Sequence, residues 1–175
     1  NSMINPDLLE HYKKHGCAHI PNIIPDEYLA IAKEKGFPLV KWAQDRIGTP
    51  TEAGPPKHNF HVGCAGAYVS ELMRIYTSKF SYDLAKDILG SSSMFLFNDQ
   101  MVYKMPNDNL EFAAHYDNQY GAENKSGDMH TVNVSWILDD FTKENGALSL
   151  KSLDDDQWTT VFPKAGDIIA INGNC

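Results

Sequence analysis

The triplet His115-Tyr116-Asp117 is the first place in this sequence where residue types and their spacing suggest chemistry. In extended backbone, residues two apart point to the same side, so this imidazole and this carboxylate can approach one metal ion together. Two histidines and one carboxylate on one face of an octahedron leave three positions open, the arrangement of non-haem Fe(II) oxygenases. The triplet alone is weak evidence, because a surface histidine beside a surface aspartate gives the same pattern.

The elements around the triplet are rich in β-forming residues. Residues 94–105 precede it and are broken by Pro106, and residues 131–138 follow it with several Val and Trp side chains. Further short strands, set between turns, are expected at 147–150, 158–162 and 167–172. Spacing of this kind is typical of a barrel or a double-sheet jelly roll.

The first ninety residues have helical periodicity instead. Asn5 and Pro6 predict a helix start, and Gly16 predicts its end. A short strand is expected at 17–21. Two more helices are expected, from Pro25 to Gly36 and from Tyr68 to Leu89.

We therefore predict a mainly β protein with N-terminal helices. The helical part covers about 1–92, and a double-stranded β-helix (jelly-roll or cupin-like) core covers about 93–175. Because the helices need the sheet to bury their apolar faces, residues 1–175 are expected to form a single domain.

Five short motifs follow one another along the second half of the chain. In order they are Lys104-Met105-Pro106, His115-Tyr116-Asp117, Leu138-Asp139-Asp140, Glu144-Asn145-Gly146-Ala147-Leu148 and Gly166-Asp167. None of them is specific alone, but their order resembles the phytanoyl-CoA dioxygenase family of Fe(II)/2-oxoglutarate oxygenases. The resemblance extends over nearly the whole chain.

The resemblance implies an oxygenase-like domain with Fe(II) as cofactor and 2-oxoglutarate as cosubstrate. His115 and Asp117 would be the first two iron ligands. Gln100, Asn133 and Ser135 lie where the family lines its 2-oxoglutarate pocket. For these three side chains an ordinary inward-facing polar role on a strand is an equal alternative, and no separate catalytic residue is assigned.

The resemblance also implies two groups that this sequence does not contain. The family's second histidine follows the Gly-Asp strand by a few residues, and an arginine that grips 2-oxoglutarate comes later. Both would lie beyond Cys175, the last residue here. We therefore expect a C-terminally incomplete oxygenase that lacks its last strands and is inactive as it stands, although its parent is an enzyme.

The expected function of the parent is hydroxylation of an unidentified small molecule or acyl substrate. Asp117 favours hydroxylation, because halogenases of the family lack this carboxylate. Two alternatives stay open: a non-catalytic metal or small-ligand binding module on the same fold, and a Zn hydrolase with three protein ligands and a water.

Composition limits the partners. Fifteen Lys and Arg stand against 23 Asp and Glu, a net charge of −8, which argues against nucleic acid or an anionic membrane surface. No stretch approaches the roughly 20 apolar residues of a membrane helix. Three widely spaced cysteines predict no disulfide framework and favour a reducing, cytoplasmic location. A small-molecule substrate is the expected partner, and the oligomeric state is left open.

Overall fold

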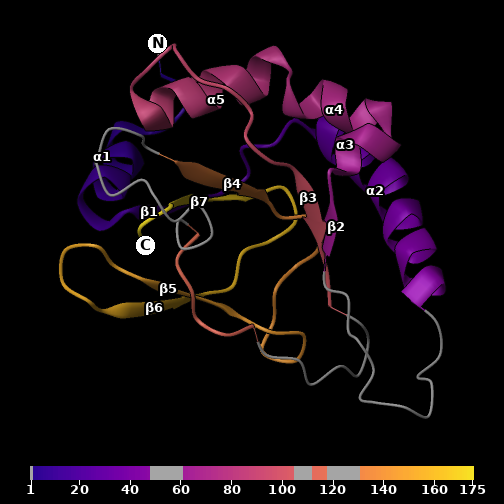
Figure 1. Ribbon diagram of the computed structural model, residues 1–175. Helices are drawn as coiled ribbons and strands as arrows, with labels where there is room; N and C mark the ends of the chain where they lie inside the picture. Colours follow the sequence, from indigo (N-terminus) through magenta and orange to yellow (C-terminus); the bar gives the residue numbers. More distant parts are fainter. Residues whose placement is uncertain (1, 48–60, 105–111, 118–130) are drawn as a thin grey trace. The chain divides into compact units, whose positions relative to one another are not determined.

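The computed structural model of this chain describes residues 2–47, 61–104, 112–117 and 131–175 (Figure 1). The chain divides into two compact units. The first comprises Asn1–Leu29, Lys79–Met94 and Ala114–Cys175, and the second comprises Ala30–Ser78 and Phe95–Ala113. The single-domain organisation stays a prediction.

The first unit is built on a three-stranded antiparallel sheet with β7 (Ile168–Asn172) at its centre. One edge of β7 pairs with β1 (Cys17–Ile20), and the other edge pairs with β4 (Val132–Trp136). A separate antiparallel hairpin is formed by β5 (Leu148–Lys151) and β6 (Trp158–Val161). The predicted strands of this half are therefore confirmed, with bounds that differ by one or two residues.

Two helices complete the first unit, α1 (Pro6–His15) and α5 (Lys79–Leu89). The predicted signals of α1 are confirmed. The Asn5 side chain accepts a hydrogen bond from the backbone N–H of Asp7 at 2.9 Å. Gly16 ends the helix in left-handed backbone, with a φ of 79°.

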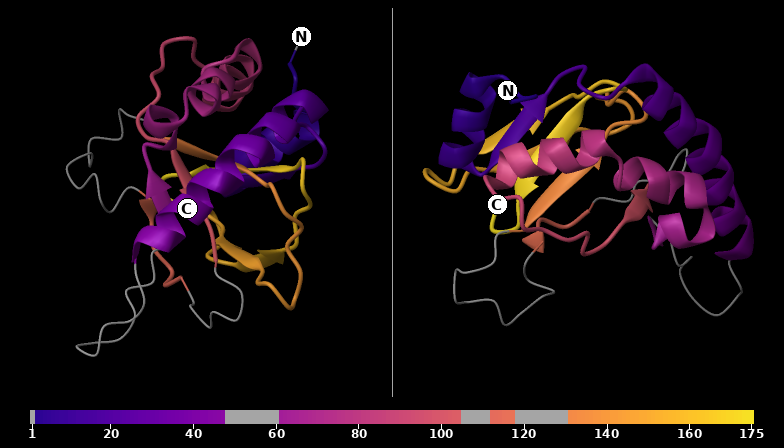
Figure 2. Two further views of the ribbon diagram at one scale, coloured as in Figure 1. Left: turned by 90° about the vertical axis from the view of Figure 1, so that its right-hand side faces the viewer. Right: turned by 90° about the horizontal axis from the view of Figure 1, so that it is seen from above.

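The sheet is covered on both faces, which explains why the first four residues of β7, 168–171, are all apolar. Ile168 and Ala170 pack with the helices α1 and α5, whereas Ile169 and Ile171 pack with the β5–β6 hairpin. Figure 1 shows the sheet between α5 and the hairpin, and Figure 2 shows α5 crossing the strands when seen from above. A continuous apolar run is the sequence signature of a strand buried on both sides.

The second unit holds a two-stranded antiparallel sheet and most of a long helix. Val62 of β2 pairs with Met101 of β3, and both side chains are buried. The elements are α2 (Asp26–Ile47), which begins in the first unit, β2 (His61–Gly63), α3 (Ala65–Tyr68), α4 (Ser70–Tyr76) and β3 (Gln100–Val102).

Three element boundaries differ from the prediction. The helix expected to end at Gly36 continues through Pro38 to Ile47, because Leu39 and Ala43 give its second half a buried face. The helix expected from Tyr68 to Leu89 is divided into α3, α4 and α5. Within 94–104, only β3 is a strand, and residues 105 and 106 lie outside the described residues.

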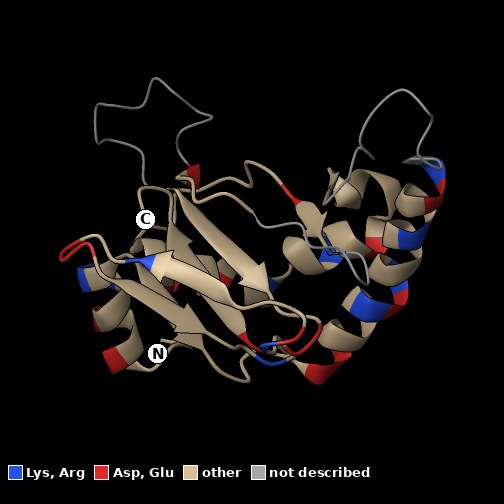
Figure 3. Ribbon diagram, turned by 90° about the horizontal axis from the view of Figure 1, so that it is seen from below, with Lys and Arg blue, Asp and Glu red and all other residues tan. Residues whose placement is uncertain are grey.

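Charge is concentrated away from the strands. In Figure 3, most Lys, Arg, Asp and Glu lie on helices and in turns, whereas the strands are largely uncharged. Among the residues that the structure describes, no helix is both long and apolar enough to cross a membrane.

A comparison of Gly16 with Gly90 separates the effect of side-chain packing from the effect of backbone conformation. Gly16 (φ 79°) and Gly90 (φ 67°) both follow helices in left-handed backbone. A Cβ atom on Gly16 would lie 2.5 Å from Leu153 side-chain atoms, whereas one on Gly90 would meet nothing within 4 Å. Gly90→Ala should lower the free energy of unfolding by about 1 kcal/mol. Gly16→Ala should lower it by about 2–3 kcal/mol, because Leu153 must also move. Equal losses in urea unfolding would contradict this packing.

Candidate metal centre

His115 and Asp117 lie in the described segment 112–117, outside the strands, in the first unit. The Nε2 atom of His115 is 3.4 Å from Oδ1 of Asp117. The two side chains are 43% and 37% exposed, so both groups are accessible from solvent. An octahedral ion with bonds of about 2.1 Å has neighbouring donor atoms about 3 Å apart. This nitrogen and this oxygen therefore fit one edge of a coordination octahedron.

The second carboxylate oxygen of Asp117 is held by β4. The side-chain amide of Asn133 donates a hydrogen bond to Oδ2 of Asp117 at 3.1 Å. The hydroxyl of Ser135 donates to Oδ1 of Asn133 at 2.8 Å. Because the amide oxygen of Asn133 accepts the hydrogen bond from Ser135, the NH2 group of Asn133 faces the Asp117 carboxylate. Four of the five predicted site residues are thus linked through side-chain contacts.

The alternating sequence of β4 places these groups. Val132, Val134 and Trp136 pack against the core under α1 and α5. Asn133 and Ser135 alternate with them and point to the opposite face of the sheet. One five-residue strand therefore buries an apolar face and presents two polar side chains on the other.

Gln100 belongs to the second unit. It is an exposed residue of β3, opposite Gly63 of β2. The structure therefore brings together His115, Asp117, Asn133 and Ser135, and describes Gln100 only within its own unit.

A comparison with protein-family models identifies the family of this chain. The model described as phytanoyl-CoA dioxygenase (PhyH) matches residues 12–152, most of the chain. The chain belongs to the phytanoyl-CoA dioxygenase family. The resemblance given by the order of motifs is thereby confirmed. No curated protein matches the chain at a significant level.

Solved structures share the fold at low sequence identity. EctD from S. alaskensis, crystallised with 2-oxoglutarate and 5-hydroxyectoine, has a TM-score of 0.79 and 17% identity, covering 99% of this chain and 69% of that one. The α-ketoglutarate-dependent carbocyclase SnoK from nogalamycin biosynthesis has a TM-score of 0.74 and 16% identity, covering 99% and 77%. AviO1 from Streptomyces viridochromogenes Tue57 has a TM-score of 0.74 and 16% identity, covering 99% and 86%.

These likenesses confirm the predicted fold class, a jelly-roll core with N-terminal helices. The predicted cofactors are also confirmed for the family, whose enzymes use Fe(II) and 2-oxoglutarate. The donor set of His115 and Asp117, one imidazole nitrogen and one carboxylate oxygen, suits Fe(II).

Other family motifs in this chain hold turns. The carboxylate of Asp140 accepts a hydrogen bond from the backbone N–H of Ala165 at 2.9 Å. The side chain of Asn145 donates to the carbonyl oxygen of Asp140 at 2.7 Å and accepts from the N–H of Thr142. The Leu-Asp-Asp and Glu-Asn-Gly motifs therefore fix the connection that follows β4.

The Gly166-Asp167 motif joins the ends of β1 and β7. The buried carboxylate of Asp167 accepts hydrogen bonds from the backbone N–H groups of Asn22 and Lys164, each at 2.8 Å. It also lies 2.6 Å from Nε2 of His19. Burial acts to raise the pKa of Asp167, but these hydrogen bonds and His19 outweigh it and hold the pKa below its ordinary value.

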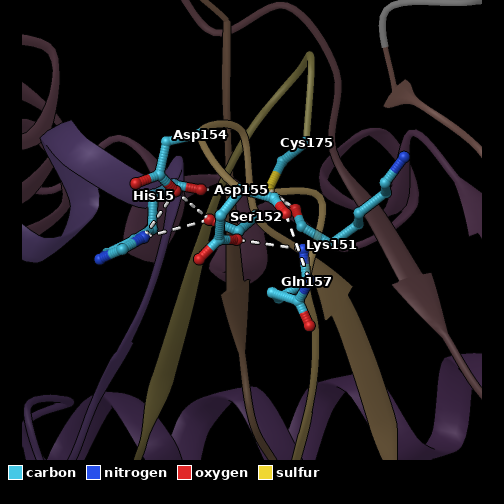
Figure 4. Close-up of polar contacts among 7 residues, drawn as sticks. All are labelled: His15, Lys151, Ser152, Asp154, Asp155, Gln157 and Cys175. Atoms are coloured by element: carbon cyan, nitrogen blue, oxygen red, sulfur yellow. Dashed lines mark hydrogen bonds and ion pairs between the residues drawn. The ribbon is translucent and has the colours of Figure 1, made fainter.

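A second group of metal-ligand atoms lies between the end of α1 and the turn that joins β5 to β6 (Figure 4). Nδ1 of His15 is 2.8 Å from Oδ1 of Asp154, and the Ser152 hydroxyl contacts both side chains. Donor atoms of His15, Asp154 and Asp155 lie within 4.8 Å of one another. The Ser152 hydrogen bond and His15 lower the pKa of Asp154. Spacing could not reveal this group, because α1 and the β5–β6 turn are far apart in sequence.

Asp167→Asn should destabilise the first unit at neutral pH. An amide has one acceptor oxygen, so the backbone N–H of Asn22 or of Lys164 loses its partner, and the free energy of unfolding should fall by about 2–3 kcal/mol. The carboxylate of the wild type stabilises the fold fully above its unfolded-state pKa. That contribution disappears as pH falls through the lower folded-state pKa, so the gap between the two proteins should shrink in acid.

Urea unfolding at neutral pH and near pH 3 measures this gap. The exposed neighbour Asp139 offers a matched control, because Asp139→Asn should change stability by no more than about 0.5 kcal/mol. A gap for Asp167→Asn that widens in acid would show that the hydrogen-bonded carboxylate is not the cause.

Proposed function

We propose that this chain carries the iron-binding part of an Fe(II)/2-oxoglutarate-dependent dioxygenase that hydroxylates a small molecule or an acyl substrate. The observation that carries the proposal is the convergence of His115 Nε2 and Asp117 Oδ1 at 3.4 Å, with the other oxygen of Asp117 bonded to Asn133. Membership of the phytanoyl-CoA dioxygenase family supports the reaction class.

In this proposal His115 and Asp117 are the two iron ligands that the chain supplies. When bound, Fe(II) with 2-oxoglutarate supplies O2-dependent oxidation of a substrate C–H bond. Asp117 places a charged oxygen at the ion and fills a position that a halide would otherwise need, which favours hydroxylation. Asn133 is a positioning residue, because its hydrogen bond leaves Oδ1 of Asp117 directed to His115.

Ser135 and Gln100 are proposed as polar groups of the 2-oxoglutarate site. Ser135 shares a face of β4 with Asn133, beside the proposed ligands, and Gln100 rests on its position in the family pattern. The proposed substrate class is supported by proteins of the same fold. EctD was crystallised with 5-hydroxyectoine, and the epimerase SnoN was crystallised with Fe3+, alpha ketoglutarate and nogalamycin RO.

His115→Ala and Asp117→Ala should each weaken binding of Mn2+, a spectroscopic substitute for Fe(II), by about tenfold or more. The physical reason is that each change removes one of the two donor atoms. Titration followed by electron paramagnetic resonance of free Mn2+ measures the affinity without turnover. Both side chains are partly exposed, so the variants should unfold at nearly the same urea concentration as the wild type.

Asp155→Ala is the matched control, because it removes a carboxylate from the group near His15. Its Mn2+ affinity should equal that of the wild type. Loss of binding in Asp155→Ala with retention in His115→Ala would contradict the proposed site. Mn2+ binding at the matching His-x-Asp pair of a family member that forms no succinate from 2-oxoglutarate would favour a non-catalytic binding module.

Asn133→Ala should weaken Mn2+ binding about tenfold while leaving both ligands in place, because the Asp117 carboxylate loses the hydrogen bond that the Asn133 amide donates from β4. Asn133→Asp also loses the hydrogen bond at neutral pH, but it should weaken Mn2+ binding less than Asn133→Ala, because the new carboxylate can itself attract the ion. The same titration separates these variants, and an Asn133→Ala affinity equal to that of the wild type would remove Asn133 from the site.

A further inference from the structure

Two cysteines from opposite ends of the sequence meet in the first unit. Cys17 begins β1 and is buried, and Cys175 follows β7 and is half-buried. Both belong to the apolar cluster between the sheet and the hairpin, with Leu150 and Ile169. The sequence spacing predicted no disulfide framework, but the fold brings these two thiols together.

The pairing of β1 with β7 accounts for this meeting. Cys17 is opposite Ile171 in the ladder, and the N–H of Asn172 donates to the carbonyl oxygen of Gly16 at 2.7 Å. A turn closed by the Cys175 N–H and the Asn172 carbonyl oxygen then directs the chain back. Cys175 therefore returns to the edge that β1 forms.

The Cys175 thiol donates a hydrogen bond to the carbonyl oxygen of Lys151 at 2.6 Å (Figure 4). Its sulfur also lies 3.7 Å from the carbonyl oxygen of His15, and 3.4 Å from the position a Cβ atom would take on Gly16. Cys17 follows Gly16 and packs in the same apolar cluster as Cys175, and each thiol affects the pKa of the other. Both cysteine side chains therefore lie in one cluster beside the β1–β7 pairing.

We propose that Cys17 and Cys175 form a reversible disulfide that closes the β1–β7 edge covalently, with a small-molecule disulfide such as glutathione disulfide as oxidant. The thiolate of Cys175, the more exposed of the two, attacks one sulfur of the oxidant and expels one glutathione thiolate. The thiolate of Cys17 then attacks the Cys175 sulfur and expels the second. Two protein thiols are oxidised, and one glutathione disulfide is reduced to two glutathione molecules.

The surroundings make this exchange slow. Burial raises the pKa of Cys17 and raises that of Cys175 to about 12, and the buried phenol of Tyr12 lies nearby with its pKa also raised to about 12. Few thiolates therefore form at neutral pH. Cys64 is exposed in the second unit, so it should react faster and keep glutathione as a mixed disulfide.

The test is incubation of the native protein with excess glutathione disulfide at mildly alkaline pH, followed by alkylation, trypsin and mass spectrometry. Cleavage after Lys14, Lys33 and Lys164 places Cys17 in peptide 15–33 and Cys175 in peptide 165–175. We expect these two peptides to be linked, and the link to disappear on reduction. Peptide 58–74, which contains Cys64, should carry glutathione instead.

Serine variants make the result specific. In the Cys64→Ser variant, the two remaining thiols should both be consumed in the disulfide, and no glutathione should stay bound to the protein. Cys17→Ser should retain glutathione on Cys175, because no second thiol can displace it. Oxidation should raise the urea midpoint of Cys64→Ser but not that of Cys17→Ser. Stable glutathione on Cys175 in the wild type, no link at all, or a link formed only in urea would each overturn the proposal.

Discussion

The rest of the first unit depends on one constraint: β7 is a central strand that must be apolar on both faces. Its Ile168 and Ala170 side chains form the core with the helices, and Ile169 joins the core with the hairpin. All three of these residues are fully buried. Because both edges of β7 are also paired, β1 and β4 are fixed in register by one strand. A one-residue slip would turn every side chain of a strand to the wrong face.

The register of β4 connects this constraint to chemistry. Val134 faces the helices opposite Ala170, which leaves Asn133 and Ser135 on the other side of the sheet. The amide of Asn133 then reaches Asp117, a residue outside the strands. The proposed metal ligands are exposed, but the group that orients Asp117 belongs to a strand of the three-stranded sheet. Asp167 stabilises the same sheet by tying the turn after β1 to the start of β7.

Local signals predicted much of this fold. The cap at Asn5, the stop at Gly16 and the apolar run of β7 act over a few residues, and the structure contains all three. The predicted end at Gly36 was wrong, because burial of Leu39 and Ala43 carries the helix past Pro38. Tertiary packing decides where such a helix ends, and helix propensity over one turn carries no information about that packing.

The candidate site was predictable only as residue types. The His-x-Asp spacing and the motif order selected His115 and Asp117, and their role as ligands stays a proposal. The hydrogen bond from Asn133 to Asp117 and the carboxylate network of Asp167 depend on which strands pair, which no local pattern specifies. For the same reason, the sequence did not predict the contact of His15 with Asp154 or the proximity of Cys17 to Cys175.

Paramagnetic broadening by Mn2+ in the NMR spectrum of 15N-labelled protein tests the central claim most directly, because it locates the ion without any substitution. The proposed site predicts that signals from the His115 ring and the Asn133 side-chain amide broaden first, at low Mn2+ concentration. The Ser152 and Asp154 backbone signals, beside the group near His15, should stay sharp at that concentration. Broadening of Ser152 and Asp154 first, with Asn133 unaffected, would contradict a metal centre at His115 and Asp117.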